Sequence, residues 1–474
     1  MTGRLASLLD EGLERGSGAI VEDPGGRLDA GGILARAGAV AAELARHGIG
    51  PDEPVLVSVG NRAADFAALL GTWRAGAVAV PVHSTTPGRV LESLREATGV
   101  RLVLDGATGE AARVADRPPP GRALLDGAAL VIFTSGSTGA PKGVVIGHGR
   151  LAGKLDVLRS VLGIAHGPHT LLPLQVTFIF GIWVSLVTVL AGGRLTMMPK
   201  FTPAEARAAL GSGVTTAAFV PTMLRALFSE AAPPPAAPDL TRILTGGEPL
   251  GEGLGTRIAR SFPAADLYDL YGLTETGSCD FCVTPELRAA APGTIGMPTP
   301  GVAFRIAEPA DAGAGGAGEL LIRTPYGMLG YLDRPDLTAA AFTDGWFRTG
   351  DLARRRPDGT VELAGRAKDI VSRGGNKIAP LEIDRLFCSH PDVVAALAAG
   401  VPDPLLGERL HVMVVPRAGS AVDARSLADW AAERIERFKI PDVFHFSAEL
   451  PLGRTGKADR GALRDWIAQG AKNG

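Results

Sequence analysis

Apolar positions in the first hundred residues alternate between a helical spacing and short continuous runs. From Leu28 to Leu44 they recur near one helical face, and the segment stops at Gly48 and Pro51, residues that commonly end helices. The same alternation predicts strands over 54–60, 77–82 and 101–105, with helices over 28–47, 64–76 and 89–99. Short apolar strands separated by such helices are typical of a largely parallel sheet covered on both faces. The pattern therefore predicts an α/β fold.

A different pattern begins near residue 365. It predicts helices over 380–390 and 426–438, and strands over 393–401, 409–415 and 443–447. Strands and helices in that order, within roughly a hundred residues, favour a small α+β domain. We therefore expect an N-terminal domain over 1–364 and a C-terminal domain over 365–474.

One uncharged stretch, residues 171–193, is long enough to span a bilayer. It contains Pro173, Gln175 and Gly181, which argue against a single membrane helix. A buried turn followed by a helix is the favoured interpretation.

Composition narrows the class of function. The net charge is −2 with 5% aromatic residues, so nothing indicates binding to nucleic acid or an anionic membrane. Three cysteines are too few for a disulfide framework, and the first residues lack an apolar signal core. We expect a cytoplasmic protein, a monomer or homodimer, that acts on a small molecule.

The loop FTSGSTGAPKGVV, residues 133–145, combines residue types that bind phosphate. Hydroxyls, glycines that turn backbone amides outward, and a lysine occur together in it. It is not a Walker A loop, because Lys142 precedes Gly143 instead of a serine or threonine. The alternative is a flexible surface turn. A second Gly-Lys pair, in LPLGRTGKADR at 450–460, has no strand and helix around it to form a nucleotide loop.

Six segments in order resemble the signatures of the adenylate-forming superfamily. They are the loop at 133–145, TGGEPL (245–250), YDLYGLTETG (268–277), WFRTGDL (346–352), GRAKDIVSRGGNKIAPLEID (365–384) and LPLGRTGKADR. The superfamily contains acyl- and aryl-CoA synthetases, adenylation domains of peptide synthetases and beetle luciferases. The resemblance implies a large N-terminal domain of mostly parallel sheets plus a distorted barrel, and a small mobile α+β C-terminal domain.

Position by position, the resemblance implies a nucleotide site. The residues that would hold the β- and γ-phosphates of ATP are Thr134, Ser135, Gly136, Ser137, Thr138, Gly139 and Lys142. Those that would surround adenine are Gly246, Gly247, Glu248 and Pro249 as one wall, Tyr271 against the ring, Gly272 beside it and Asp269 near the amino group. Asp351 would accept hydrogen bonds from the ribose, with Arg366 nearby.

The resemblance also implies the catalytic groups. Thr274 would touch the α-phosphate, Glu275 would help hold Mg²⁺, Lys457 would be the catalytic lysine and Lys368 the hinge between the domains. A carboxylate must be joined to a good leaving group before it can be displaced, and ATP supplies one when pyrophosphate departs. Charge gathers on the phosphoryl oxygens in that step, so fixed cations are needed there. A flexible lysine suits this bridging task.

The second half-reaction would transfer the acyl group to a thiol. Gly374 and Gly375 would let backbone approach a narrow pantetheine arm. The segments GGNKIAPLEID and VPDPLLGERL resemble those of free-standing acyl-CoA ligases more than those of peptide-synthetase domains. This resemblance favours CoA as the thiol that accepts the acyl group. The alternatives are a carrier protein's phosphopantetheine, another nucleophile such as an amine, an ordinary P-loop kinase or ATPase, and a non-catalytic relic.

The acid itself is not identified by the sequence. The stretch 171–185 has no acidic residue to pair with an α-ammonium, which argues against an amino acid and leaves a medium-sized or aromatic acid as our expectation. Candidates for the acyl pocket are Phe178, Phe180, Trp183, Phe219 and Thr222, although each aromatic could equally be core. Cys279 and Cys282 have the spacing of half a metal site, yet we expect them to be small apolar lining.

Overall fold

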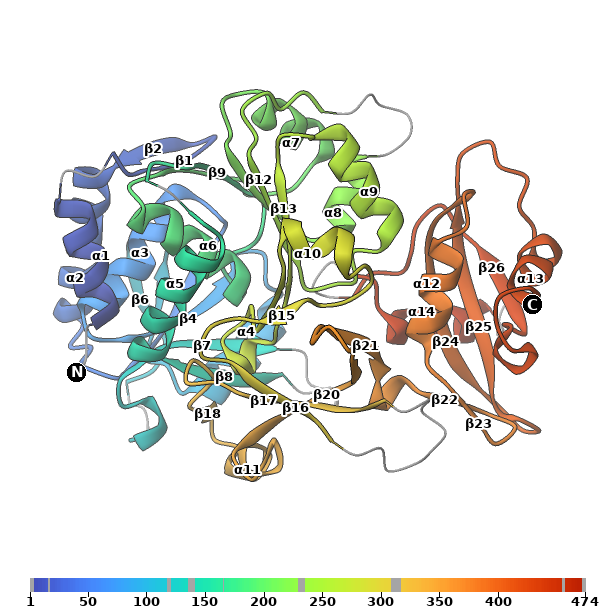
Figure 1. Cartoon of the computed structure of the whole chain (residues 1–474). Helices are drawn as coiled ribbons and strands as arrows, with labels where there is room; N and C mark the ends of the chain where they lie inside the picture. Colours follow the sequence, from blue (N-terminus) through green and yellow to red (C-terminus); the bar gives the residue numbers. More distant parts are fainter. Residues whose placement is uncertain are drawn as a thin grey trace.

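A computed structural model gives the structure of residues 4–15, 18–116, 121–134, 141–164, 166–228, 235–307, 317–453 and 457–470. It contains four sheets (Figure 1). The first has the strand order β18 (Gly330–Tyr331), β8 (Lys142–Gly147), β7 (Ala128–Thr134), β4 (Val78–His83), β3 (Pro54–Val59), β5 (Leu102–Asp105) and β6 (Ala111–Arg113). Its central strands β7, β4, β3 and β5 are parallel, as the apolar runs predict.

The second sheet is the largest. Its order is β15 (Met297–Pro298), β14 (Phe281–Val283), β13 (Asp266–Tyr271), β12 (Arg242–Gly246), β11 (Thr216–Phe219), β9 (His169–Leu172), β10 (Arg194–Met197), β1 (Ile20–Asp23) and β2 (Gly26–Asp29). The strands from β13 through β1 are parallel, and the edge pairs are antiparallel. Parallel strands place their carboxyl ends at one edge, where ligands commonly bind in such sheets.

Helices fill the space between these two sheets and cover their outer faces. Between the sheets lie α1 (Arg4–Glu14), α2 (Ala30–Arg46), α3 (Ala63–Arg74), α5 (His148–Val161) and α6 (Ile179–Leu190). Outside them lie α4 (Gly88–Thr98) on the first sheet and α7 (Pro203–Leu210), α8 (Pro221–Leu227) and α9 (Glu252–Ser261) on the second. Shorter elements are η1 (Ala123–Leu125), η2 (Thr274–Thr276), α10 (Pro285–Ala290) and α11 (Pro335–Ala340).

The uncharged stretch at 171–193 forms the end of β9, a turn and the buried helix α6, which confirms the turn-and-helix interpretation. None of the helices in the described ranges is long and apolar enough to cross a membrane. One boundary near the N-terminus was predicted wrongly: Leu28 belongs to β2 and not to the following helix. The helix begins after Asp29, whose Oδ1 accepts a hydrogen bond from the Gly32 amide at 2.8 Å and so caps it.

The third and fourth sheets follow in the chain. The third is antiparallel and contains β16 (Ala303–Ile306), β17 (Gly318–Arg323), β20 (Trp346–Arg355), β19 (Phe342–Thr343) and β21 (Val361–Arg366). The fourth contains β23 (Asn376–Ile378), β22 (Val371–Arg373), β25 (Gly407–Pro416), β24 (Val393–Asp403) and β26 (Val443–Phe446). With it lie η4 (Ala367–Asp369), α12 (Pro380–Cys388), α13 (Ala424–Ala432), η5 (Arg437–Lys439) and α14 (Arg460–Gly470).

The fourth sheet and its helices form a separate unit, drawn in orange and red beside α8 and α9 (Figure 1). Its buried apolar clusters draw only on residues from Val371 onward, whereas the other described clusters end at Leu363 or before. The mixed α/β class expected from the sequence is confirmed. Helix α13 is shorter than predicted, because the residues from 433 to 437 alternate charges around the single apolar Ile435 and offer no continuous face to bury.

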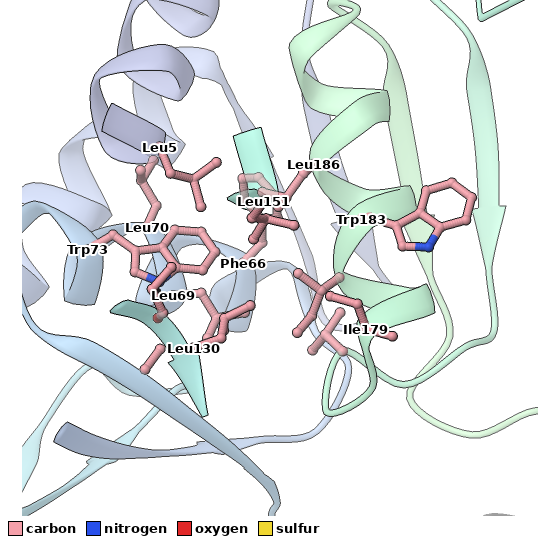
Figure 2. Close-up of a cluster of buried hydrophobic side chains, with 14 of the residues drawn as sticks. Leu5, Phe66, Leu69, Leu70, Trp73, Leu130, Leu151, Ile179, Trp183 and Leu186 are labelled. Carbon is pink, nitrogen blue, oxygen red and sulfur yellow. Dashed lines mark hydrogen bonds between the residues drawn. The ribbon is translucent and has the colours of Figure 1, made fainter. Parts of the chain in front are cut away.

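Helices α2 and α3 approach each other closely at Gly71. A methyl group on this residue of α3 would lie 2.6 Å from the carbonyl oxygen of Ala37 on α2. The same helix α3 also carries the buried Phe66, Leu70 and Trp73, which Figure 2 shows gathered with Leu5 and Leu130. Trp183 lies apart from that group in the same view. The Trp73 indole donates a hydrogen bond to the Ala129 carbonyl at 2.8 Å, which ties α3 to β7.

Replacing Gly71 by alanine should therefore destabilise the protein by about 1–3 kcal/mol through overpacking, although alanine is the better helix former. Gly38→Ala is the matched control, because that helical glycine has only Arg74 Nη1 nearby, at 3.8 Å from an added methyl group. Thermal unfolding should show a lower Tm for Gly71→Ala and an unchanged or higher Tm for Gly38→Ala. Equal responses would contradict the close helix crossing.

Candidate active site

The candidate site begins where two neighbouring parallel strands end. Strand β12 ends at Gly246 and β13 at Tyr271, and Gly246 lies opposite Leu270 in the ladder. The loops GGEPL and GLTETG therefore leave the sheet side by side. An added methyl group on Gly246 would lie 2.4 Å from the Leu270 carbonyl oxygen, so this close approach requires glycine. The sequence motifs at 245–250 and 268–277 are thus brought together by the sheet.

A lysine from the fourth sheet's unit reaches this edge. The Nζ of Lys457 would be 2.5 Å from a methyl group on Gly247, a residue with φ of +83°. The Gly453 amide donates a hydrogen bond to the Lys457 carbonyl at 2.8 Å, and Leu452 pairs with Ala458. Lys457 is thereby placed against the loop that follows β12.

Burial and charge set the protonation of Lys457. Burial lowers the pKa of its ammonium below the usual value, and the positive charge of Arg366 lowers it further. The carboxylate of Glu248 acts in the opposite direction and raises the pKa. Glu248 is therefore the group that favours the charged lysine at this position.

Glu248 is held from the other side by α8. Its Oε2 accepts hydrogen bonds from the Thr222 hydroxyl at 2.7 Å and from Arg225 Nη2 at 2.9 Å. Its Oε1, and the buried hydroxyl of Thr245, have no hydrogen-bond partner in the described part of the chain. Buried polar atoms without partners fit a site that takes a polar ligand.

Asp351 lies at the centre of a second group. Its Oδ2 accepts a hydrogen bond from the Tyr271 hydroxyl at 2.6 Å, and its Oδ1 accepts one from Arg366 Nε at 2.9 Å. Asp351 and Arg366 face each other on β20 and β21. Burial, followed by the charge of Asp351, raises the pKa of Tyr271, so the phenol remains a hydrogen-bond donor. The structure thus brings together Tyr271, Asp351 and Arg366, three of the residues expected around adenine and ribose.

Asp269 lies two residues before Tyr271 on the same face of β13. Burial raises the pKa of its carboxyl to about 6, although the Arg288 guanidinium opposes that shift. A carboxyl whose pKa is shifted in this way, on the strand that leads into the candidate site, is typical of a ligand-binding position.

Glu275 is positioned by a residue that the sequence analysis did not select. The Tyr331 hydroxyl donates a hydrogen bond to Glu275 Oε1 at 3.0 Å, and Lys142 Nζ lies 5.3 Å from the centre of the Tyr331 ring. Strand β18 carries Tyr331 against β8, which begins with Lys142. Tyr331 therefore links the end of the glycine-rich loop to the expected Mg²⁺ ligand. The only signal in the sequence was an aromatic residue in a chain with four tyrosines.

The glycine-rich loop is described only at its ends. Thr134 closes β7, and it pairs with Lys142 at the start of β8. Ser135, Gly136, Ser137, Thr138 and Gly139 lie outside the described residues. Their expected contacts with phosphate stay predictions.

The expected acyl-pocket residues do not form one group. Phe178 is 38% exposed at the start of α6, and Phe180 stacks on Trp183 with ring centres 5.1 Å apart. Trp183 and Phe219 are both 1% exposed, yet they belong to buried clusters on opposite faces of the second sheet. Thr222 contacts Glu248 as described above. Core packing accounts for Phe219, so Thr222 is the member of the set that the structure ties to the GGEPL loop.

The remaining predicted residues are spread around this centre. Thr274 and Glu275 form the η2 turn, and Pro249 is exposed after Glu248. Lys368 lies in η4. The next residue, Asp369, has its Oδ2 3.7 Å from Nε of Arg460, and Arg460 follows Lys457 by three positions in the chain. Gly374 and Gly375 turn between β22 and β23 with φ of +54° and +83°, and a methyl group on Gly375 would meet no described atom within 4 Å.

Cys279 and Cys282 are both buried. Burial raises the pKa of the Cys279 thiol to about 12 and raises that of Cys282 as well. Within the described ranges no group of three or more His, Cys, Asp or Glu side chains is arranged to hold a metal ion. Both thiols belong to the largest buried apolar cluster, together with Leu270 and Met328.

Comparison with known proteins identifies the family. The profile of the AMP-binding enzyme family matches residues 14–120 and 105–332, and that of the AMP-binding enzyme C-terminal domain matches residues 382–457. The chain belongs to the AMP-binding enzyme family. Its resemblance to the adenylate-forming superfamily is thereby confirmed.

Three relatives illustrate the range. A sulfoacetate–CoA ligase of Cupriavidus necator is 32% identical over 92% of both chains. ScoC, a fatty acid–[acyl-carrier-protein] ligase of Streptomyces coeruleorubidus, is 32% identical over 80% of this chain and 75% of its own. The ATP-bound structure of MatB from Rhodopseudomonas palustris has a TM-score of 0.86 at 24% identity, covering 98% of this chain and 99% of MatB, which shows a shared fold.

The approach of Lys457 to Gly247 predicts a selective effect of one methyl group. Gly247→Ala should reduce formation of acyl-adenylate by about 100-fold, because the methyl group would occupy the position of the ammonium. Gly251→Ala is the matched control: its φ is +77°, so the backbone strain is similar, but a methyl group there meets nothing within 4 Å. ATP–pyrophosphate exchange measures both variants. Comparable losses in the two would show that strain, and not contact with Lys457, causes the effect.

Proposed function

We propose that this protein is an ATP- and Mg²⁺-dependent acid:thiol ligase, which joins a carboxylic acid to AMP with release of pyrophosphate and then transfers the acyl group to CoA. The observation that carries the proposal is the contact of the Lys457 ammonium with Gly247. The charges of Glu248 and Arg366 both act on this ammonium, and Arg366 is bonded to Asp351, which also binds Tyr271. Lys457, from the unit that begins at residue 365, thus reaches the loop after β12, where the nucleotide would bind. This arrangement supports the adenylation half-reaction in particular.

In this half-reaction the acid's carboxylate oxygen attacks the α-phosphorus of ATP and the bond to pyrophosphate breaks. Asp351 would bind the ribose and Tyr271 would lie against adenine, which fixes the nucleotide. Lys457 would contact the carboxylate and the phosphate and offset the charge that develops between them. Holding both reactants in one orientation removes much of the entropic part of the barrier.

The residues present also fit a magnesium ion. Glu275 would hold it, with the Tyr331 hydroxyl keeping the carboxylate oriented, and Lys142 would lie near the outer phosphates. When bound, Mg²⁺ neutralises phosphate charge and favours departure of pyrophosphate. The buried hydroxyl of Thr245 and the Oε1 of Glu248 provide further polar contacts for a ligand.

Thiol transfer would use a second orientation of the unit that begins at residue 365. In the present orientation Lys457 lies against Gly247, and an added methyl group on Gly375 would meet nothing within 4 Å. Rotation about Lys368 would withdraw Lys457 and bring that turn to the acyl-adenylate. The separate apolar clusters on either side of residue 365 support a division into domains 1–364 and 365–474.

The acceptor and the acid are the finer parts of this proposal. CoA is favoured by the sulfoacetate–CoA ligase relative at 92% coverage, whereas ScoC keeps a carrier protein as the second candidate. The acid would be medium-sized or aromatic and would lack an α-ammonium group, because the 171–185 stretch has no acidic residue to pair with one.

A panel of carboxylic acids with ATP and Mg²⁺ tests the reaction class. The protein should release AMP and pyrophosphate with at least one acid, and form a thioester when CoA is added. Release of ADP and phosphate would overturn the ligase proposal. Comparison of CoA with a phosphopantetheinylated carrier protein decides between the two acceptors.

Lys457→Ala separates the half-reactions. Formation of acyl-adenylate from acid and ATP should fall by about 100-fold or more, because the cation at the reacting centre is lost. Transfer from a supplied acyl-adenylate to the thiol should remain within a few-fold of the native rate. Equal loss of both would contradict the role given to Lys457.

The pH profile tests the electrostatics of Lys457. Adenylation needs the protonated amine, so its rate should fall as pH rises through the lowered pKa of Lys457. Glu248→Gln removes the carboxylate that raises this pKa, so the alkaline limb should move to lower pH. Thr222→Val serves as the control, because it removes a hydrogen bond to Glu248 but keeps its charge. An unchanged alkaline limb in Glu248→Gln would assign that limb to another group.

A further inference from the structure

A fully buried lysine lies behind the turn that carries Thr274 and Glu275. Lys154, on α5, is 1% exposed. Its Nζ donates a hydrogen bond to the Cys279 carbonyl at 2.8 Å and lies 5.4 Å from the centre of the Tyr326 ring. The reaction described above does not use this cation.

Its counter-charge is Asp280, which is 0% exposed. Lys154 Nζ and Asp280 Oδ1 are 3.9 Å apart, an ion pair longer than a hydrogen bond. Asp280 Oδ2 accepts a hydrogen bond from the Thr276 hydroxyl. Burial raises the pKa of Asp280 to about 7, and Lys154, Thr276 and the Leu273 backbone act against that shift. Removing two charges from water is unfavourable, so apolar residues would stabilise a core at least as well.

The turn between Glu275 and Asp280 has an unusual backbone. Gly277, Ser278 and Cys279 have φ of +86°, +67° and +48° in succession. Residues other than glycine rarely adopt positive φ, so the backbone of Ser278 and Cys279 is strained. Contacts with the surrounding residues must stabilise this conformation. The Cys279 carbonyl accepts both Lys154 and the Thr299 hydroxyl, the latter at 2.9 Å.

The same turn is closed from inside by Thr276. The Leu273 amide donates to the Thr276 hydroxyl oxygen at 3.2 Å, and Thr276 in turn donates to Asp280. Thr274 and Glu275 lie between these two ends, in η2. An added methyl group on Gly272 would lie 2.4 Å from the Cys279 amide nitrogen, so the turn folds directly back on the end of β13. Its two ends are thus fixed from behind by one buried ion pair.

We propose that Lys154 and Asp280 are positioning residues for adenylation: the pair holds the 273–280 turn so that Thr274 and Glu275 face the nucleotide. The inference rests on the proposed ligase function. The hydrogen bond from Lys154 fixes the strained carbonyl of Cys279, and Asp280 fixes Thr276 at the end of η2. Neither residue reacts with substrate.

Lys154→Met tests the proposal, because methionine has a similar length without charge or donor. ATP–pyrophosphate exchange should fall by about 100-fold, as expected when catalytic groups shift by about 1 Å. Transfer of a supplied acyl-adenylate to the thiol should change by a few-fold at most. Equal loss in both half-reactions, or no loss in either, would overturn the proposal.

The double variant Lys154→Met/Asp280→Asn separates positioning from stability. It removes the unpaired buried charge, so its Tm should recover toward the native value. The Cys279 carbonyl still lacks its lysine donor, so pyrophosphate exchange should remain low. Recovery of exchange together with Tm would show that the pair serves stability alone.

Asp65→Asn is the matched control for a buried carboxylate elsewhere. Asp65 is 0% exposed and accepts the amides of Gly60 and Arg62 at 2.8 and 2.7 Å. It should lower Tm and leave the ratio of the two half-reaction rates unchanged. If Asp65→Asn slowed pyrophosphate exchange but not thiol transfer, as expected for Lys154→Met, loss of any buried charge would produce that effect. The proposal would then fail.

Amide hydrogen exchange over residues 271–280 measures how firmly the turn is held, independently of enzyme activity. Both Lys154 variants should exchange faster there than the native protein, while Asp65→Asn should not. Unchanged protection in Lys154→Met would overturn the positioning role. A native protein that forms no adenylate with any acid would instead refute the ligase function, and the exchange result would still decide whether the pair holds the turn.

Discussion

The contact between the Lys457 ammonium and the Gly247 backbone is the constraint on which the site depends. It requires a residue without a side chain at the end of β12, where φ is +83°, and a lysine long enough to cross from another sheet. The lysine is partly desolvated there, which lowers its pKa, and Glu248 is placed to offset that cost. A cation in such surroundings acts on nearby phosphate charge more strongly than one in water.

The carboxylates around this contact are held by different partners. Asp351 is bonded by Tyr271 and Arg366, Glu275 by Tyr331, and Glu248 by Thr222 and Arg225. Each carboxylate is therefore oriented by a hydroxyl group from an element remote in sequence. Fixed groups of this kind need little reorganisation when charge moves in a reaction.

The parts of the structure that were predictable from sequence are those that local pattern specifies. The apolar runs at 54–60 and 77–82 form parallel strands because a strand buried on both faces must be apolar throughout. The motifs at 245–250 and 268–277 meet because they follow neighbouring strands. Helix α13 was predicted too long. The spacing of apolar residues continues past Ala432, but it does not show that the charged residues after it provide no apolar face for burial.

The residues that sequence reasoning missed act through long-range pairing. Tyr331 reaches Glu275 only because β18 pairs with β8, and those strands are almost 190 residues apart. Lys154 looks like any lysine on a helix, whose usual position is the surface. Its burial depends on how α5 packs against the 273–280 turn, which no local pattern records.

A covalent lock on the present orientation tests the central claim most directly. Gly253 on α9 lies close to the end of α12, since a methyl group on it would be 3.9 Å from the Cys388 carbonyl oxygen, and Ser389 follows there as an exposed residue. The variant Gly253→Cys/Ser389→Cys/Cys388→Ala can be joined by a short bifunctional maleimide. If Lys457 must leave Gly247 before thiol transfer, the joined protein should retain ATP–pyrophosphate exchange and lose thioester turnover, both relative to the same variant left unjoined. Full thioester turnover in the joined protein would contradict that requirement.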